Sequence, residues 1–267
     1  MSLRQSVLLC EGYHDRAFWS GWLRYLGCVD PGTSLPGGGR AEVLAPWGKP
    51  VRGGDYGFHS KRGEFVRVRP CQGRDGVMRE AGRLLSEESK GVGQAVAASQ
   101  LSRLVFALDP DANVEDPSGP TGFRGQDLQP WARQFDADAV SDPSGDMVLF
   151  QGSTLVSLVR WEASDAGRLG LPGKQCLERL VCAALVAAFP ERGASVQTWL
   201  DGRPNGPAAG PKEFAWSHMA GWYAEHGCQE FYSYLWAAES GNGRVRAELE
   251  TRLRECGAWQ IAEALAE

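Results

Sequence analysis

Two short apolar runs that end in acidic residues constrain the fold of this chain more than any other feature. Residues 104–108 are followed at once by Asp109 and Asp111, and residues 7–10 are followed by Glu11. Apolar runs of this length, bounded by turn-forming residues, are typical of strands that are buried on both faces, as in a parallel sheet. The sequence therefore predicts two buried strands with carboxylates at their carboxyl ends.

The positions of these carboxylates predict a divalent-metal site. Side chains alternate along a strand, so Asp109 and Asp111 are expected to point the same way, and Glu11 occupies the equivalent end of the first strand. In open α/β sheets, ligands bind beyond the carboxyl ends of the strands. Clustered carboxylates repel one another, and a hard cation such as Mg²⁺ or Mn²⁺ relieves that repulsion. We therefore expect Mg²⁺, or Mn²⁺, as the cofactor.

The first part of the chain, residues 1–165, alternates between strand and helix patterns. This order predicts an α/β fold with a mostly parallel sheet flanked by helices. Residues 31–63 form a Gly/Pro-rich insertion with an excess of basic residues, which indicates a long loop. Asp75 is a candidate N-cap for the second helix. The expected elements are strands at 7–10, 64–69, 104–108, 147–150 and 154–161, and helices at 15–26, 77–85 and 128–135.

The second part, residues 166–267, is predicted to be a helical C-terminal region. Apolar residues recur there at helical spacing. A Gly/Pro-rich loop at 202–211 interrupts the series. The expected helices cover residues 174–189, 212–225, 230–238 and 244–266.

The composition says more about where the protein is expected to be located than about what it binds or which reaction it catalyses. The net charge of −5 decides little about nucleic-acid binding, because a local basic groove can exist on an acidic molecule. The seven cysteines are scattered and never form a CxxC pair, which predicts reduced thiols and a cytoplasmic location. The longest apolar stretch, residues 180–189, is about half of the roughly 20 residues needed to span a bilayer. Neither a signal segment nor a membrane span is expected.

The order of the acidic residues resembles the TOPRIM domain, which occurs in topoisomerases, primases, recombination proteins and OLD-type nucleases. The matching residues are Glu11-Gly12-x-x-Asp15 and Asp109-x-Asp111. Residues 66–74 are similar to the second strand and the Gly-basic turn of small stand-alone and OLD-like TOPRIM nucleases, so the resemblance covers about residues 5–160. Residues 171–178 also resemble the C-terminal part of a family of small stand-alone TOPRIM-like proteins.

The resemblance implies a role for each matching residue. Asp109 and Asp111 would hold Mg²⁺, and Glu11 would be a catalytic metal ligand or general acid/base. Asp15 and Glu178 would be further ligands, for one ion or for two. The Gly-basic turn would bind phosphate through the residues Gly73 and Arg74. Two features depart from the family: the long basic insertion, and arginine rather than lysine at position 74.

Each of these residues also has a structural interpretation. Asp15 could serve as a helix N-cap, with or without a metal. Glu178 lies near Lys174 and Arg179 in the sequence and could be a surface ion-pair residue, and Arg74 could be a solvated turn residue. The tryptophans fit core or interface positions better than base-stacking platforms.

A lone DxD also occurs in other enzymes. In haloacid-dehalogenase-type phosphatases it lies on the first strand, and in DxD glycosyltransferases no glutamate is needed at the end of that strand. Neither pattern suits this chain as well as the TOPRIM pattern does.

Two functions are therefore expected. The first is a Mg²⁺-dependent TOPRIM phosphotransferase, most simply a nuclease that hydrolyses phosphodiester bonds in DNA or RNA, in nucleic-acid processing or phage defence. The alternative is a TOPRIM-scaffold binding or regulatory subunit that acts only with a partner, such as a separate ATPase. The Trp-rich helices after Lys212 motivate this alternative, and the sequence contains no GxxxxGK[ST] motif of its own.

Overall fold

The computed structural model divides the chain into two compact units. The sheet unit comprises Met1–Leu108, Phe123–Val159 and Gln260–Glu267, and the helical unit comprises Asp109–Gly122 and Arg160–Trp259. The start of the predicted 31–63 insertion, with the basic residues Arg40, Lys49 and Arg52, lies outside the described residues. The structure describes residues 3–29, 54–89, 99–116, 122–143, 145–151, 153–165, 167–204, 210–220, 228–237 and 241–267.

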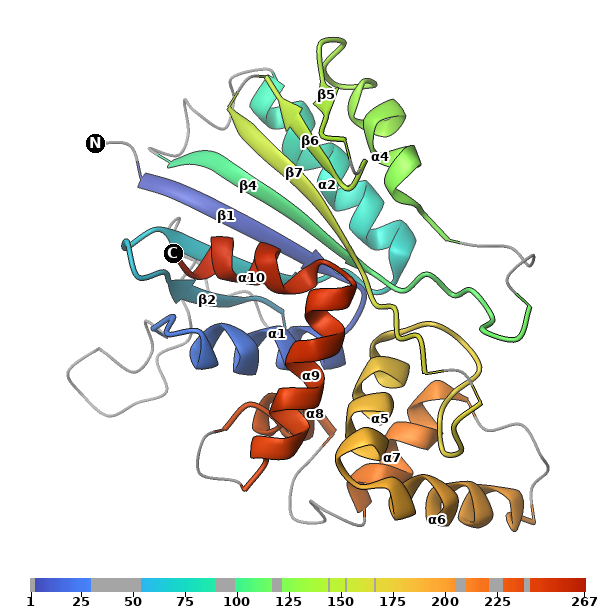
Figure 1. The fold of residues 1–267 in the computed structure, drawn as a ribbon. Coiled ribbons are helices and arrows are strands. Elements are labelled where there is room, and N and C mark those ends of the chain that lie inside the picture. The colour runs from blue at the N-terminus through green and yellow to red at the C-terminus, as the bar shows by residue number, and fades with distance from the viewer. Residues whose placement is uncertain are drawn as a thin grey trace. The chain divides into compact units, whose positions relative to one another are not determined.

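The sheet unit is built on a seven-stranded sheet with the strand order β2-β3-β1-β4-β7-β6-β5. Figure 1 shows β1 and β4 side by side in its centre. The apolar runs that predict buried strands form these two elements, which confirms the α/β class. The strands are β1 (Leu3–Cys10), β2 (Tyr56–His59), β3 (Phe65–Pro70), β4 (Ser99–Leu108), β5 (Val140–Ser141), β6 (Met147–Phe150) and β7 (Thr154–Arg160).

The prediction of a mostly parallel sheet is wrong, because the sheet is mixed. Strand β1 pairs in parallel with β3 and β4, but β2–β3, β5–β6 and β6–β7 are antiparallel pairs. The turns after His59 and after Phe150 are only a few residues long, and a connection of that length joins antiparallel strands. Strand β2 lies within the segment that the sequence predicts to be loop.

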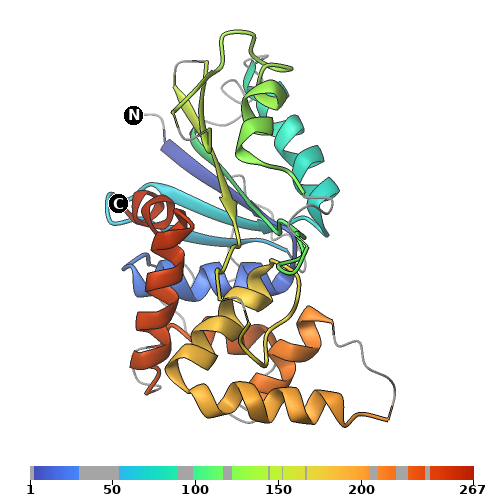
Figure 2. The same cartoon turned by 45° about the vertical axis from the view of Figure 1, so that its right-hand side comes forward.

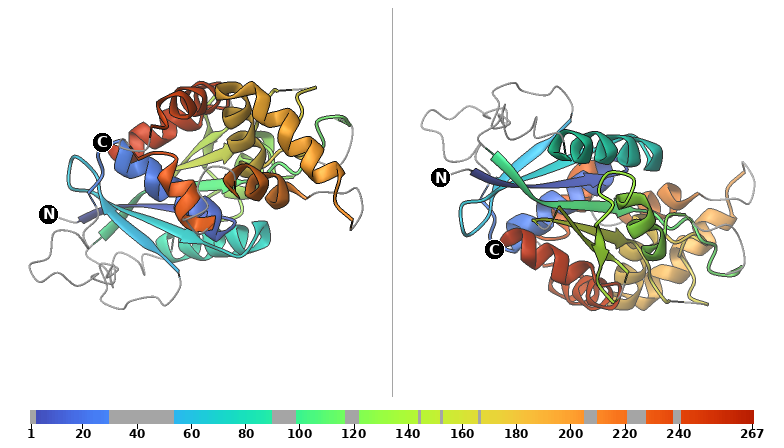
Figure 3. Two further views of the ribbon diagram at one scale, coloured as in Figure 1. Left: turned by 90° about the horizontal axis from the view of Figure 1, so that it is seen from below. Right: turned by 90° about the horizontal axis from the view of Figure 1, so that it is seen from above.

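Helices cover both faces of this sheet. Figures 2 and 3 show α1 (Tyr13–Tyr25) on the face opposite α2 (Arg74–Ser89). On the α2 face, Val7 and Leu9 of β1 join one apolar core with residues of α2 and of α4 (Gly125–Ala132). Side chains alternate along β1, so Leu8 faces the other way, and it is also fully buried. The two-sided burial explains the continuous apolar runs.

The end of the chain returns to the sheet unit. The backbone N–H of Lys61 donates to the carbonyl oxygen of Ala266 at 2.9 Å, and that of Arg62 donates to Glu267 at 3.0 Å. These bonds join the β2–β3 turn to the last residues of α10 (Ala258–Ala266). The C-terminal segment is therefore part of the same compact unit as the first strand.

The helical unit is organised around α5, which is buried over nearly all its length because its sequence is apolar on almost every side. Helix α5 packs against α6, α7 and α9. No helix in the described part of the chain is both long and apolar enough to cross a membrane. The helices are α5 (Leu177–Ala188), α6 (Pro190–Asp201), α7 (Pro211–Ala220), α8 (Cys228–Tyr234) and α9 (Gly243–Glu255).

Several predicted helix boundaries need correction. Helix α6 is not predicted; it begins directly after α5, with Pro190 at its first position, where the missing N–H of proline has no cost. The predicted helix 244–266 is two helices, because Gly257 adopts a left-handed φ of 75° between α9 and α10. Residues 221–227 of the predicted helix 212–225 and of the segment after it lie outside the described residues.

Candidate functional site

The turn after β1 carries Glu11 and Asp15, both in the sheet unit. Glu11 is half-buried, and α1 begins two residues later at Tyr13. The N-cap is Gly12, and the buried carboxylate of Asp15 accepts a hydrogen bond from the Gly12 N–H at 3.2 Å. Asp15 is thus the acidic member of a capping arrangement rather than the N-cap itself. The prediction of Asp15 as the N-cap is therefore wrong, although its carboxylate does bind a backbone N–H at the start of α1, and its metal role stays a prediction.

The Gly-basic turn lies against the backbone of Glu11. The N–H of Gly73 donates to the carbonyl oxygen of Glu11 at 2.7 Å, and the N–H of Cys71 donates to that of Cys10 at 2.8 Å. Gly73 has a φ of 96°, which favours glycine. Arg74, half-buried, is the first residue of α2, so Asp75 lies in the first turn of that helix and is not its N-cap. The structure therefore brings Glu11 and the predicted phosphate-binding residues together.

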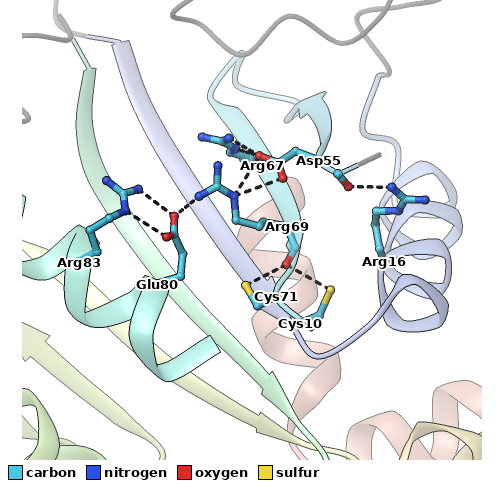
Figure 4. A network of polar contacts seen from close by, with 9 residues as sticks. Cys10, Arg16, Asp55, Arg67, Arg69, Cys71, Glu80 and Arg83 are labelled. Atoms are coloured by element: carbon cyan, nitrogen blue, oxygen red, sulfur yellow. Dashed lines mark hydrogen bonds and ion pairs between the residues drawn. The ribbon is translucent and has the colours of Figure 1, made fainter. Parts of the chain in front are cut away.

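A chain of ion pairs joins β3 to α2 near this turn, and sequence reasoning missed it. Figure 4 shows the Asp55 carboxylate between the guanidinium groups of Arg67 and Arg69. The distance from Arg69 Nε to Asp55 Oδ2 is 3.1 Å. Arg69 also contacts Glu80 of α2, and Glu80 in turn accepts from Arg83 at 2.8 Å. Arg67 and Arg69 are two residues apart on β3, a spacing that could have predicted a shared face.

Arg16 fastens the start of α1 to the segment that precedes β2. Its Nη1 donates to the Gly54 carbonyl oxygen at 2.7 Å. Figure 4 shows Arg16 on α1 with this hydrogen bond dashed. Its guanidinium lies over the rings of Tyr56, 4.1 Å from the centroid, and Tyr13, at 4.9 Å. These cation–π contacts hold a buried arginine directly after Asp15. The turn that carries Glu11 and Asp15 is therefore bonded to the Gly-basic turn and, through Arg16, to the segment before β2.

The two thiols of this region are protonated at neutral pH. Cys10 and Cys71 both donate to the carbonyl oxygen of Arg69, at 3.4 Å and 3.7 Å. Burial, and then the charge of Asp15, raises the pKa of Cys10 well above its usual range. Burial also raises the pKa of Cys71 to about 11. A protonated thiol is a poor nucleophile, because the thiolate is the reactive form.

Asp109 and Asp111, which follow β4, belong to the helical unit. The Asp109 carboxylate accepts a hydrogen bond from the N–H of Leu177, the first residue of α5, at 3.0 Å. Negative charge at a helix N-terminus is stabilised by the helix dipole. Asp111 is exposed, has a left-handed φ of 56°, and lies 4.0 Å from the Lys174 ammonium. The two carboxylates thus have different surroundings.

The DxD segment lies beside residues 173–175, which lead into α5 and Glu178. The N–H of Asp111 donates to the Gln175 carbonyl oxygen at 3.1 Å, and the N–H of Gln175 donates to Ala112 at 2.9 Å. The N–H of Val114 donates to Gly173 at 2.9 Å. This strand-like pairing fixes the DxD segment beside the approach to α5. It joins two parts of the chain about 60 residues apart, a pairing that local patterns cannot predict.

Glu178 is buried, with 6% of its surface exposed, so the interpretation as a surface ion-pair residue is wrong. Arg179, also buried, turns to main-chain oxygens instead, donating to Pro172 and, at 2.9 Å, to Asp165. Burial, followed by the charges of Asp109 and Glu178, raises the pKa of Cys176 well above its usual value. Both carboxylates therefore lie close enough to that thiol to influence it.

These findings place the predicted metal ligands without assembling a metal site. Within the residues that the structure describes, no three His, Cys, Asp or Glu side chains gather closely enough to hold an ion. The donor chemistry suits Mg²⁺, which prefers carboxylate oxygens and keeps several waters. The assignment of Glu11, Asp15, Asp109, Asp111 and Glu178 as ligands stays a prediction.

Comparison with known proteins identifies a fold but no family. The sequence matches no model of a known protein family and no curated protein. Its structure is similar to the crystal structure of a hypothetical protein from Pyrococcus horikoshii OT3, with a TM-score of 0.68. The two chains are 14% identical, and the match covers 99% of this chain and 100% of the other. At this identity, the likeness shows a shared fold alone.

Proposed function

We propose that this protein is a Mg²⁺-dependent nuclease on a TOPRIM-like scaffold, which hydrolyses phosphodiester bonds in DNA or RNA. The observation that carries the proposal is the register of the central sheet. Strands β1 and β4 are parallel neighbours, with Cys10 opposite Ala107. Glu11 follows the first of these residues directly, and Asp109 follows the second by two positions. Strands that end together in this way bear the ligand sites of open α/β sheets.

Each acidic residue has a proposed task in this reaction. Asp109, Asp111 and Glu178 supply oxygen ligands, and Glu11 serves as a further ligand or as the general base that takes a proton from the attacking water. A bound Mg²⁺ supplies charge stabilisation for the phosphoryl oxygens. Arg74, at the start of α2, is suited to contact a phosphate through its planar guanidinium.

Two features of the helical unit support the metal-binding task. Glu178 directly follows Leu177, whose N–H binds Asp109, and the charges of both carboxylates raise the pKa of Cys176, so the two lie near the same thiol. The DxD segment is also held by backbone pairing to residues 173–175. Ligands whose backbone is fixed in this way lose little conformational entropy when they bind an ion.

The first prediction is metal-dependent cleavage that requires the acidic residues. We expect the wild-type protein, with Mg²⁺ or Mn²⁺, to cleave at least one of supercoiled plasmid, single-stranded DNA and structured RNA. Glu11→Gln and Asp109→Asn should each lower the rate by about 100-fold or more, the scale of lost acid–base or metal catalysis. Asp116→Asn, an exposed carboxylate near the DxD segment, is the matched control and should cleave normally.

The asparagine variant separates chemistry from folding. The amide oxygen of asparagine can still accept the Leu177 N–H, so Asp109→Asn should keep α5 intact, which a thermal melt can verify. Cleavage that survives both substitutions, or that EDTA does not stop, would contradict the proposal. A folded wild-type protein that binds Mg²⁺ but cleaves nothing would favour the alternative, a regulatory subunit that needs a partner such as a separate ATPase.

A further inference from the structure

A groove between α6 and α7 has no part in the proposed chemistry. Its volume is about 660 Å³, which lies in the range of small-ligand sites. The residues that line it recur at helical spacing, so each helix contributes one face. The principal lining residues are Arg192, Val196, Trp199 and Arg203 from the α6 side, and Glu213 and Trp216 from α7.

Two tryptophans make this groove unusual. Trp199 is 70% exposed and Trp216 is 44% exposed, whereas Trp19, Trp22, Trp161 and Trp236 are buried. Leaving two large aromatic side chains in water forgoes the free energy that burial provides, on the order of 2 kcal/mol for each. One stands on each of the two helices that form the groove. Exposed aromatic side chains of this kind mark a surface that is covered when a ligand binds.

The charges of the groove favour an anionic ligand. The Glu213 carboxylate accepts hydrogen bonds from the Gly210 N–H, at 2.6 Å, and from Arg203, so the charges of Glu213 and Arg203 offset each other and the charge of Arg192 is in excess. Arg203 uses Nε for the Leu200 carbonyl oxygen and Nη1 for Glu213. A guanidinium has five N–H donors, so donors of Arg203 remain for a phosphate. With Arg192, the lining carries one more positive charge than negative.

We propose that this groove binds single-stranded nucleic acid, with bases stacked on Trp199 and Trp216 and a phosphate held by Arg203. Base–aromatic stacking requires an exposed ring face, and bases in a duplex cannot offer theirs. The interior of the groove, with Val196 and Leu200, suits the flat apolar face of a base. The inference rests on the proposed function, because it names the substrate of the nuclease: a strand with unpaired bases.

A helix from a second copy of this protein is the competing occupant, and the charges argue against it. A helix that fills a groove binds through its apolar side chains, so the groove that receives it needs no excess of positive charge. Here, arginines stand beside the exposed rings, the combination that proteins use for single strands. We therefore argue for the nucleic acid, and the experiment includes the other outcome.

The test measures binding without cleavage. The full-length Glu11→Gln protein is titrated, in EDTA, with a fluorescent oligothymidine of about 20 nucleotides and with a labelled duplex, and anisotropy is recorded. Trp199→Ala combined with Trp216→Ala should weaken oligothymidine binding by about tenfold or more, since stacking contributes strongly per base. Tyr25→Ala removes an aromatic ring that is 44% exposed in the sheet unit, and this matched control should bind normally.

Each outcome decides between the ideas. Equal binding by all variants, or stronger binding of the duplex than of the single strand, would overturn the inference. So would self-association of the Glu11→Gln protein in sedimentation that the double tryptophan variant loses, because the rings would then serve a protein contact. If binding depends on the tryptophans but the wild-type protein never cleaves, only the proposed function fails. If cleavage occurs and binding ignores the tryptophans, only this inference fails.

Discussion

At the scale of single residues, several polar side chains of the helical unit hold main-chain groups. Asp109 accepts the first N–H of α5, and Arg179 donates to carbonyl oxygens of the loop before that helix. His218 of α7 lies 2.9 Å from the Gly170 carbonyl oxygen through Nε2 and is fully buried. A buried polar group must be hydrogen-bonded, so each of these residues fixes a loop as well as itself.

His218 makes the stability of the fold depend on pH. Burial lowers the pKa of its imidazole to about 4, whereas the unfolded chain has a value near 6.5. The unfolded state therefore binds more protons between these values, and the stabilisation present above about pH 6.5 is lost as the pH falls toward 4. We expect a loss of about 2–3 kcal/mol in the free energy of unfolding from this residue.

His218→Gln isolates the effect. Glutamine can donate to Gly170 but does not titrate, so its free energy of unfolding should change less than that of the wild type between about pH 7.5 and pH 4.5. Urea unfolding at both pH values measures the difference. Identical pH dependence in the two proteins would show that His218 does not carry the loss.

At the scale of elements, buried ion pairs position helices. The Arg252 guanidinium of α9 binds the Asp165 carboxylate through Nε at 2.9 Å and through Nη2 at 2.7 Å. The side chains are 7% and 9% exposed. Two residues further along the same helix, Arg254 pairs with Glu250, and these side chains are 46% and 37% exposed. The helix thus offers two arginine pairs that differ in burial.

The two arginines should differ in their effect on stability. Arg252→Met leaves the Asp165 carboxylate buried without its bidentate partner, which should lower the free energy of unfolding by about 3 kcal/mol. Arg254→Met removes an exposed pair and should cost less than about 1 kcal/mol. Chemical denaturation of both variants provides the measurement. A similar cost for the two substitutions would mean that burial of the pair does not govern its contribution.

At the scale of the whole molecule, the position of a strand in the sheet sets its stability. Strand β1 has a parallel partner on each side, while β2 and the two-residue β5 lie at the edges. A strand bonded on both sides and buried on both faces opens only when the unit unfolds, whereas an edge strand can detach alone. The order of the sheet therefore predicts an order of local opening.

Amide hydrogen exchange tests that order. We expect the amides of β1 and β4 to exchange the most slowly, and those of β5 to exchange about tenfold or more faster. Mass spectrometry of peptic fragments resolves the two regions. If β5 were protected as strongly as β1, something would have to cover that edge, for example another copy of the chain.

The sequence by itself determined the features that depend on local spacing. The apolar runs before Glu11 and Asp109 become the central strands, because a strand buried on both faces needs apolar residues at every position. Helical periodicity predicts most of the helices of both units. The apolar runs also place the acidic residues at strand ends, since a strand stops where its apolar run stops.

Only the tertiary structure decided which distant segments meet. Strand β2 is four residues long within a Gly/Pro-rich segment, and it forms because β3 offers a free edge. Nothing local shows that Glu178 is buried, or that residues 173–175 pair with the DxD segment. Periodicity shows which side of an element is apolar. Long-range pairing depends on contacts between distant segments, and the entropy cost of bringing those segments together is offset only in the complete fold.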